Sequence, residues 1–277
     1  MKRTTKRLAL VGVGAALSAL ALAGCSSGPA ATSTAAGGSA SGDVKLISPG
    51  KLTVCTHLPY APFQANDDSG KTVGFDVDMM NLVAQKLGVQ QAIVDTPFEG
   101  IKSGQDMAAG KCDVAAAGMT ITPERQKAIL FSEPYFDATQ ALLVPGGSSV
   151  NALTGLSGKK LAAQAATTGL DYAQKHSAEC GCQIVEYQDL ASETQALLSG
   201  QADAAINDLP VWSEVLKTNP GSVSIAAQFN TGEQYGFGMK LGNDALKKVV
   251  DQAISEARSD GQYDQIYKKW IGDVPAK

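Results

Sequence analysis

The chain has 277 residues, of which 44% are hydrophobic and 18% charged, and its formal net charge is −4. That length allows one large domain or two small ones, each with its own core. A negatively charged exterior argues against nucleic acid as a partner, because binding to phosphates needs clustered basic side chains.

The N-terminus has the pattern of a secretory signal peptide. A basic start precedes an apolar run over residues 8–23, which is shorter than the ~20 residues that a membrane-spanning helix needs. The run ends in Leu22-Ala23-Gly24-Cys25, which resembles the lipobox of bacterial lipoproteins. The resemblance implies cleavage after residue 24 and a lipid on Cys25; the alternative is an ordinary secretory signal with an incidental cysteine. We therefore predict a signal peptide over 1–24 and an extracytoplasmic protein anchored to the cell membrane through Cys25.

The segment after Cys25 has the composition of a linker. Residues 26–43 are almost entirely Ser, Gly, Ala, Thr and Pro. Such a composition cannot bury enough apolar surface to offset the entropy of ordering the chain. We predict a flexible tether over residues 25–45 and a folded part that begins near residue 46.

Residues 51–145 alternate between short apolar runs and helical patterns. Residues 52–55, 113–118 and 140–144 are predicted strands. In the helix that follows Gly74, apolar side chains recur at the spacing of one helix face, at Met80, Val83, Ala84 and Leu87. This alternation is typical of βαβ units around a largely parallel sheet.

The pattern then restarts after residue 147. Strands are predicted over 158–164, 184–187 and 203–207, and helices over 168–176 and 192–198. A last helix carries one apolar face, formed by Leu246, Val249, Val250, Ala253, Ile254 and Ala257. Because open α/β sheets bind ligands at the carboxyl ends of their strands, two such blocks predict a cleft between two lobes.

Four cysteines remain besides Cys25. Cys55 lies in a predicted strand and Cys112 stands at the start of another, and a buried free thiol and a disulfide are both reasonable interpretations of each. Cys180 and Cys182 can close a small ring, bind a metal or remain thiols. Because the chain has only two histidines, a zinc site is improbable, and we predict neither a metal nor a cofactor.

The segment Thr122-Pro123-Glu124-Arg125 resembles a helix start. Thr122 is placed to cap the helix, and Pro123 suits its first position. Arg125 then puts a cation in the first turn, where the helix dipole disfavours it, so an anion opposite it would explain the position. A guanidinium can bind a carboxylate through two parallel hydrogen bonds. The alternative is an ion pair within the lobe, to Glu124 or Glu133.

Seven motifs, in order along the chain, resemble those of the extracytoplasmic binding proteins of polar amino-acid ABC transporters. They are Tyr60-Ala61-Pro62-Phe63, Gly74 to Asp78, Gly110 to Asp113, Met119 to Arg125, Phe131 to Tyr135, Ala166-Thr167-Thr168 and Gln201 to Asp208. The resemblance implies an α/β protein of the type II periplasmic-binding fold, in which two crossover strands join two Rossmann-like lobes around a ligand cleft. It implies lobe 1 over 46–138 plus 233–277 and lobe 2 over 139–232.

The same resemblance implies a site for the two charged ends of an amino acid. Arg125 would hold the α-carboxylate, with the hydroxyl or amide of Thr120 and the backbone N–H of Thr168. Asp208 would accept the α-ammonium, helped by the Gly118 carbonyl. As alternatives, Asp208 caps the helix that follows it, and Thr167 and Thr168 cap theirs. Tyr60 and Phe98 would sandwich the aliphatic part of the ligand, although aromatic side chains more often belong to a core.

Two departures from the family pattern bear on specificity. Many relatives that bind cationic or amide side chains have an acid directly after the first strand, where this chain has His57. This difference disfavours a cationic ligand, because a buried cation needs a paired charge. His57 can also be a structural histidine. Candidates for the side-chain end of the ligand are His57, Gln164, Glu99 and Asn207, and Ala166 stands where relatives usually have glycine.

The function that we expect is capture of a polar amino acid and its delivery to an ABC-transporter permease, without catalysis and by a monomer. The alternative is a secreted dehydratase on the same fold, for which Glu99 or His57 would be the general acid or base. A third hypothesis, a sensor domain of a signalling protein, is less favoured because little chain follows Trp270.

Overall fold

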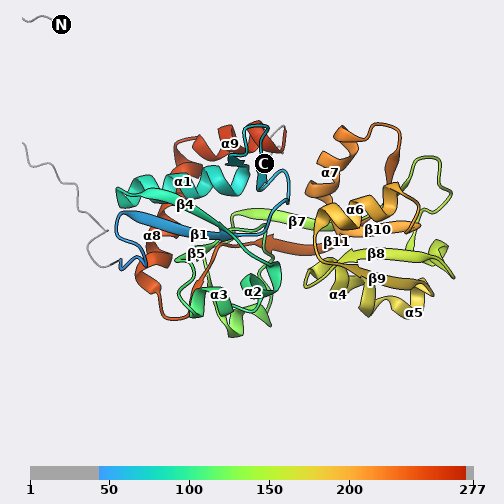
Figure 1. The fold of residues 1–277 in the computed structure, drawn as a ribbon, viewed down its shortest axis with the longest axis horizontal. Helices are drawn as coiled ribbons and strands as arrows, with labels where there is room; N and C mark the ends of the chain where they lie inside the picture. The colour runs from blue at the N-terminus through green and yellow to red at the C-terminus, as the bar shows by residue number, and fades with distance from the viewer. Residues whose placement is uncertain (1–43, 273–277) are drawn as a thin grey trace, which may run out of the picture. The chain divides into compact units, whose positions relative to one another are not determined.

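Two five-stranded sheets form the framework of the structure (Figure 1), a computed structural model that describes residues 44–272. The predicted signal peptide, Cys25 and nearly all of the predicted tether lie outside the described residues. Within them, no helix is both long and apolar enough to cross a membrane.

The first sheet has the strand order β4-β1-β5-β12-β6. Its strands are β1 (Lys51–Thr56), β4 (Gln90–Asp95), β5 (Val114–Ala115), β6 (Ile129–Phe131) and β12 (Gly238–Lys240). β1 is parallel to β4 and β5, whereas β12 is antiparallel to β5 and β6. Two further short strands, β2 (Ala65–Asn66) and β3 (Thr72–Val73), form a hairpin of their own. We call the part of the chain around the first sheet lobe 1.

Helices cover both faces of this sheet (Figure 1). On one face lie α1 (Phe75–Leu87), α8 (Asp244–Ser259) and α9 (Gln262–Trp270), which pack on one another. On the other lie the short helices α2 (Phe98–Lys102) and α3 (Gln105–Ala108), where Phe98, Ile101 and Met107 form a separate apolar cluster with Cys55 and Cys112. The predicted helix face of α1 is buried at Met80, Val83 and Ala84.

The second sheet has the strand order β11-β7-β10-β8-β9 and belongs to what we call lobe 2. Its strands are β7 (Phe136–Pro145), β8 (Lys160–Gln164), β9 (Gln183–Tyr187), β10 (Ala204–Asp208) and β11 (Val223–Tyr235). One face is covered by α4 (Thr168–Lys175) and α5 (Ser177–Cys180), the other by α6 (Leu190–Leu198) and α7 (Leu209–Thr218) (Figure 1). β8 is parallel to β9 and β10, and β7 is antiparallel to both of its neighbours.

β7 and β11 connect the two lobes. The chain leaves lobe 1 after β6, enters lobe 2 through β7, and returns through β11 to β12. The two strands pair antiparallel, with register shifts between Ile225 and Ala227 and between Phe229 and Glu233. This arrangement confirms the predicted fold class of two α/β lobes joined by two crossover strands. The predicted lobe boundaries, after residues 138 and 232, fall inside these strands.

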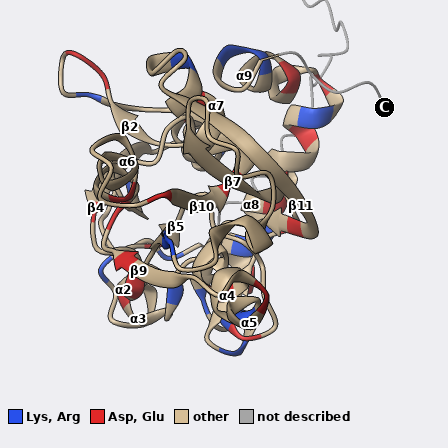
Figure 2. Cartoon of the chain, turned by 90° about the vertical axis from the view of Figure 1, so that its right-hand side faces the viewer, with Lys and Arg blue, Asp and Glu red and all other residues tan. Residues whose placement is uncertain are grey.

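The charged residues lie largely on the outside. Figure 2 shows acidic and basic residues interspersed along outer helices such as α4, α5 and α9. Two ion pairs join neighbouring helices of lobe 1, Lys86 to Glu256 at 2.7 Å and Lys269 to Asp78 at 2.8 Å. Such exposed pairs contribute little stability, about 0–1 kcal/mol each. The apolar faces of the helices therefore hold the fold together.

The prediction that a helix starts at Thr122 is wrong. The segment is a turn followed by a three-residue 3-10 helix, η1 (Arg125–Lys127), and the chain enters β6 only two residues later. Thr122 still acts like a cap, because its hydroxyl accepts the Arg125 N–H at 3.1 Å. One turn of 3-10 helix has no appreciable dipole, so the dipole argument for an anion opposite Arg125 does not hold.

All four cysteines of the folded part form disulfides. Cys55 at the end of β1 is bonded to Cys112, and Cys180 in α5 to Cys182. The interpretations of these cysteines as free thiols or metal ligands are therefore wrong. Within residues 44–272 no cluster of His, Cys, Asp or Glu is arranged to hold a metal ion.

Candidate functional site

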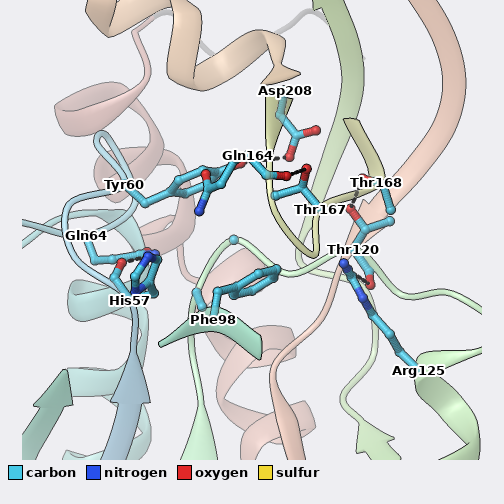
Figure 3. Close-up of a pocket in the computed structure, with 12 residues that line it drawn as sticks. His57, Tyr60, Gln64, Phe98, Thr120, Arg125, Gln164, Thr167, Thr168 and Asp208 are labelled. Atoms are coloured by element: carbon cyan, nitrogen blue, oxygen red, sulfur yellow. Dashed lines mark hydrogen bonds between the residues drawn. The ribbon is translucent and has the colours of Figure 1, made fainter. Parts of the chain in front are cut away.

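A pocket lies where the two lobes meet (Figure 3). Lobe 1 lines it with His57, Tyr60, Gln64, Phe98, Ala117, Gly118, Thr120 and Arg125, and lobe 2 with Gln164, Thr167, Thr168 and Asp208. All ten residues that we predicted from the sequence to bind a ligand are among these twelve. Gln64 and Ala117 were not predicted.

Asp208 is the anionic group of the pocket. It ends β10 and precedes α7, but its side chain does not cap that helix, so the capping alternative is wrong. Instead, its carboxylate accepts hydrogen bonds from the hydroxyls of Tyr60, at 3.1 Å, and Tyr235, and from the Gln140 amide. Burial, together with the charge of Glu233, raises the pKa of Asp208 to about 6, although these hydrogen bonds oppose the shift.

The two tyrosines that contact Asp208 act as donors. Burial, and then the neighbouring Asp208, raise the pKa of both Tyr60 and Tyr235 well above the ordinary value. Both hydroxyls therefore stay protonated. The Tyr60 hydroxyl also lies 3.0 Å from Asn207 Oδ1, so a lobe 1 side chain contacts two lobe 2 residues directly.

Arg125 is the cationic group and is only 5% exposed. Its Nη1 donates to the Thr120 carbonyl at 2.8 Å and its Nη2 to the Ala166 carbonyl in lobe 2 at 3.0 Å. Burial lowers the pKa of Arg125, and the carboxylates of Asp171, Asp208 and Glu233 oppose that shift. The guanidinium also lies 5.5 Å from the centre of the Phe98 ring.

The alternative of an ion pair between Arg125 and Glu124 or Glu133 is wrong. Glu124 pairs with Lys127, and Glu133 lies 3.8 Å from Lys247. The Arg125 side chain instead points toward Thr120 and Thr168 in the pocket (Figure 3). It therefore presents its remaining N–H groups beside the N-terminus of α4.

The two threonines at the start of α4 have different roles. Thr167 caps the helix, since its hydroxyl accepts the Leu170 N–H at 3.2 Å and donates to the Gln164 carbonyl at 2.7 Å. The Thr168 hydroxyl donates to Glu233 at 2.9 Å instead. The first N–H groups of a helix have no partner within it, so Thr168 can offer its backbone N–H to an anion in the pocket.

Gly118 has a backbone conformation that suits glycine. Its φ is +54°, and a Cβ there would lie 2.9 Å from a ring carbon of Tyr60. Its N–H donates to Asp76 at 2.8 Å. Asp76 also accepts the Tyr135 hydroxyl at 2.6 Å, and burial raises its pKa to about 7 against these two hydrogen bonds. Asp76 belongs to the motif after Gly74, but we had assigned it no role.

Three residues of the crossover strands complete the site, and sequence reasoning missed them. Gln140 lies on β7, and Glu233 and Tyr235 lie on β11. One oxygen of Glu233 accepts hydrogen bonds from Thr120 at 3.2 Å, from Gln140 at 3.0 Å and from Thr168. Glu233 therefore links both lobes next to the register shift in β11. Its partners are far away in the sequence, so no local pattern could have identified it.

The opposite end of the pocket is lined by polar side chains without a carboxylate. In Figure 3, His57 and Gln64 lie on the side away from Thr120 and Thr168. His57 Nδ1 lies 3.0 Å from the Thr96 carbonyl, so the structural role proposed for this histidine holds alongside its place in the pocket wall. Tyr60 and Phe98 likewise belong both to apolar clusters and to the wall.

Of the other candidates for this end, Gln164 lines the pocket, whereas Asn207 and Glu99 do not. Asn207 is buried behind the wall, where its Nδ2 donates to Glu193 at 2.8 Å and lies 3.4 Å from Gln164 Oε1. Glu99 is directed outward, with 69% of its side chain exposed and Lys102 at 3.9 Å. Asn207 can therefore act on the pocket only through its neighbours.

Ala166 has an unusual backbone conformation for a residue with a Cβ. Its φ is +66°, and no other non-glycine residue of the described chain has a positive φ. The left-handed conformation costs a non-glycine residue about 1–2 kcal/mol. Ala166 is held there while its carbonyl accepts the hydrogen bond from Arg125.

Replacing Ala166 with glycine is expected to stabilise the protein. The relief of strain exceeds the entropy that glycine adds to the unfolded chain, about 0.4–1 kcal/mol, so the melting temperature should rise by about 1–4 °C. Calorimetry measures the change. The neighbouring Ala165→Gly, at a position without a positive φ, is the matched control and should lower the melting temperature. If the melting temperature of Ala166→Gly is no higher than that of Ala165→Gly, the backbone of Ala166 is not strained.

Comparison with known proteins finds a family whose sequence pattern matches most of the chain. The model of the bacterial extracellular solute-binding proteins, family 3, matches residues 52–273. The ABC transporter glutamine-binding protein GlnH of Bacillus subtilis is 34% identical over 217 residues, which cover 76% of this chain and 77% of that protein.

Solved structures agree with that match. An ancestral arginine-binding protein bound to arginine has a TM-score of 0.76 at 38% identity, over 80% of this chain and 99% of the other. The ancestral amino acid-binding protein AncCDT-1, a precursor of cyclohexadienyl dehydratase, has a TM-score of 0.75 at 34% identity, over 80% of this chain and 96% of the other.

Proposed function

Because the chain belongs to the bacterial extracellular solute-binding proteins, family 3, we propose that it binds a polar amino acid between its lobes and delivers it to an ABC-transporter permease. One observation carries the proposal: a buried guanidinium and a buried carboxylate line the same inter-lobe pocket. A zwitterion can leave water only where both of its charges find partners.

We assign the two charged ends as follows. Arg125, held by the Thr120 and Ala166 carbonyls, uses its remaining N–H groups for the α-carboxylate, together with the backbone N–H of Thr168. Asp208 and the Gly118 carbonyl accept the α-ammonium. The Thr120 and Thr168 hydroxyls already donate to Glu233, which favours the backbone amides as the groups that bind the carboxylate.

The same proposal includes the boundaries of the two lobes, their closure and the monomeric state of the protein. Lobe 1 comprises residues 46–138 and 233–277, lobe 2 comprises residues 139–232, and they close about β7 and β11 as a monomer. Tyr60 and Phe98 pack on the aliphatic part of the ligand from lobe 1. The ligand thereby contacts both lobes, and its binding favours their closed arrangement.

A binding protein explains the pocket better than an enzyme does. A dehydratase needs a positioned general acid or base, and Glu99, one of the two candidates, is directed outward. The other, His57, lines the pocket, but the paired sites for a carboxylate and an ammonium suit an α-amino acid better than the substrate of a dehydratase. AncCDT-1 is described as an amino acid-binding protein. We propose that this chain is a binding protein and not a catalyst.

A thermal-shift screen of the twenty amino acids tests the function. Ligand at ~100 times its dissociation constant adds about 2.7 kcal/mol of stability, which raises the melting temperature by about 5–10 °C. We expect this response to at least one polar amino acid and none to the corresponding α-hydroxy acid, which lacks the ammonium group. If no amino acid shifts the transition, the proposed function is wrong.

Binding should weaken in acid because of Asp208. Only the ionised carboxylate attracts the ammonium, and the Asp208 pKa of about 6 leaves it mostly ionised at pH 7 and about one-tenth ionised at pH 5. The dissociation constant should therefore rise about tenfold between pH 7 and pH 5. Calorimetric titration near pH 6, in buffers of different ionisation enthalpy, should show proton release upon binding. A constant affinity from pH 7 to pH 5 would contradict the role of Asp208.

The family is extracellular, and two disulfides suit an oxidising compartment. For the N-terminus we propose a signal peptide over 1–24 and a lipid on Cys25 that anchors the protein to the cell membrane. The Cys25→Ser variant should lose the lipid and be found in the soluble extracytoplasmic fraction instead of the membrane. Fractionation of cells that produce the variant measures this change. Membrane retention of that variant would exclude a lipid on Cys25 as the anchor.

A further inference from the structure

Two buried polar atoms in the wall of the pocket have no partner. They are Nε2 of His57 and Oε1 of Gln64, and neither has a hydrogen-bond partner among the described residues. Both residues line the pocket, and Gln64 is only 1% exposed. Buried polar atoms are nearly always hydrogen-bonded, so this pair indicates that a group of the ligand belongs there.

Both atoms are acceptors. His57 Nδ1 lies 3.0 Å from the Thr96 carbonyl, which can only accept, so Nδ1 carries the hydrogen, and in that tautomer Nε2 offers its lone pair. The Gln64 amide donates through its Nε2 to the His57 carbonyl at 3.4 Å. The opposite orientation of that amide would place two carbonyl oxygens together, so Oε1 is the free atom.

These acceptors lie where the side chain of a bound amino acid ends. Figure 3 shows His57 and Gln64 across the pocket from Thr168 and Arg125, with Tyr60 and Phe98 between the two ends. A ligand whose carboxylate faces Arg125, and whose aliphatic part lies along these rings, directs its terminal group toward His57 and Gln64. That group must donate hydrogen bonds to satisfy the two atoms.

The charges that line the pocket indicate which kind of hydrogen-bond donor the end of the ligand carries. Asp208 is the single acid among the described lining residues, and the α-ammonium uses it. Glu193 lies behind Asn207 and does not line the pocket, and burial raises its pKa well above the ordinary value, which disfavours its charged form. A guanidinium or ammonium group at this end would therefore be buried without a partner of opposite charge. A carboxylate has no hydrogen to donate.

We propose that the ligand is a carboxamide amino acid, glutamine or asparagine, whose terminal NH₂ group donates to His57 Nε2 and Gln64 Oε1. The neutral amide carries two N–H donors on one nitrogen, which matches the two acceptors. This inference rests on the proposed function and names the substrate class of the same site.

Calorimetric titration with glutamine, asparagine, glutamate, aspartate, arginine, lysine and histidine tests the proposal. We expect one carboxamide to bind at least 100-fold more tightly than its acid counterpart, because the acid leaves both acceptors unpaired, and at least tenfold more tightly than arginine. Tightest binding of arginine, lysine, histidine or an acid would overturn the carboxamide assignment while leaving the amino-acid function intact. If none of these amino acids binds, the carboxamide assignment is wrong as well, and the screen of all twenty then decides the proposed function separately.

Variants of Gln64 make the test specific to these atoms. Gln64→Leu should weaken glutamine or asparagine binding by about tenfold. Gln64→Glu places an anion at the same position and should raise the ratio of arginine to carboxamide affinity by at least tenfold. The matched control is Gln91→Leu on β4, which removes the amide of a half-buried glutamine whose Nε2 also has no partner among the described residues, but which lies outside the pocket. If Gln64→Leu and Gln91→Leu have the same effect on binding, Gln64 does not contact the ligand.

Discussion

Asp208→Asn is expected to weaken amino-acid binding by at least 100-fold. Asparagine keeps the shape of the side chain, but the α-ammonium is left in a buried site without a counter-charge. Removing one partner of a buried ion pair typically costs about 3–5 kcal/mol, and about 2.7 kcal/mol corresponds to a 100-fold change in Kd. Because the variant mimics the protonated carboxyl, it should also lose the dependence of affinity on pH between 5 and 7.

Calorimetric titration measures the loss, and a second aspartate supplies the control. Asp137 lies on the neighbouring strand β7, is exposed and bonds Gln234 at 2.8 Å. Asp137→Asn removes the same charge from the same sheet without altering the pocket, so its affinity should stay within about twofold of wild type. An Asp208→Asn variant that binds within tenfold of wild type would show that the ammonium is held elsewhere.

Arg125→Lys should reduce the affinity by a similar factor, about 100-fold, although it keeps the positive charge. Lysine cannot donate simultaneously to the Thr120 carbonyl, the Ala166 carbonyl and both oxygens of a carboxylate. It also removes one of the direct contacts between the lobes. Titration calorimetry reports the affinity, and small-angle scattering should show a larger radius of gyration for the variant.

The neighbouring cation on the same 3-10 helix is the control for Arg125. Lys127 is exposed and pairs with Glu124, so Lys127→Ala should change neither affinity nor radius of gyration. If Arg125→Lys retains wild-type affinity, binding of the α-carboxylate does not need the two parallel hydrogen bonds of the guanidinium. That result would contradict the proposed zwitterion site while leaving the fold unaffected.

The sequence predicts those parts of this protein that depend on local patterns. The apolar spacing of α1 and its end at Gly88, where φ is +69°, follow from helix periodicity and from the freedom of glycine. The alternation of strands and helices gives the two α/β blocks. The helix expected at Thr122 shows the limit of such reasoning, because the start signal is present but β6 follows too soon for a helix to continue.

The site was predictable only in part. Resemblance to a family supplied Arg125 and Asp208, whereas local reasoning gave a wrong account of why an arginine stands at position 125. Gln140 and Glu233 lie 93 positions apart, and only the pairing of β7 with β11 brings them together. The disulfide between Cys55 and Cys112 likewise depends on the approach of two segments, which no spacing along one segment can show.

The direct contacts between the lobes have a kinetic consequence. Tyr60 bonds Asp208 and Asn207 across the pocket, and Arg125 bonds the Ala166 carbonyl. We expect a solute to pass only after these bonds break, so that entry and exit both wait for the same unimolecular step. In a stopped-flow experiment the observed association rate should therefore level off at high solute concentration, at the rate constant with which the lobes part. The rate at which the permease receives the solute would then be limited by the opening of the binding protein itself.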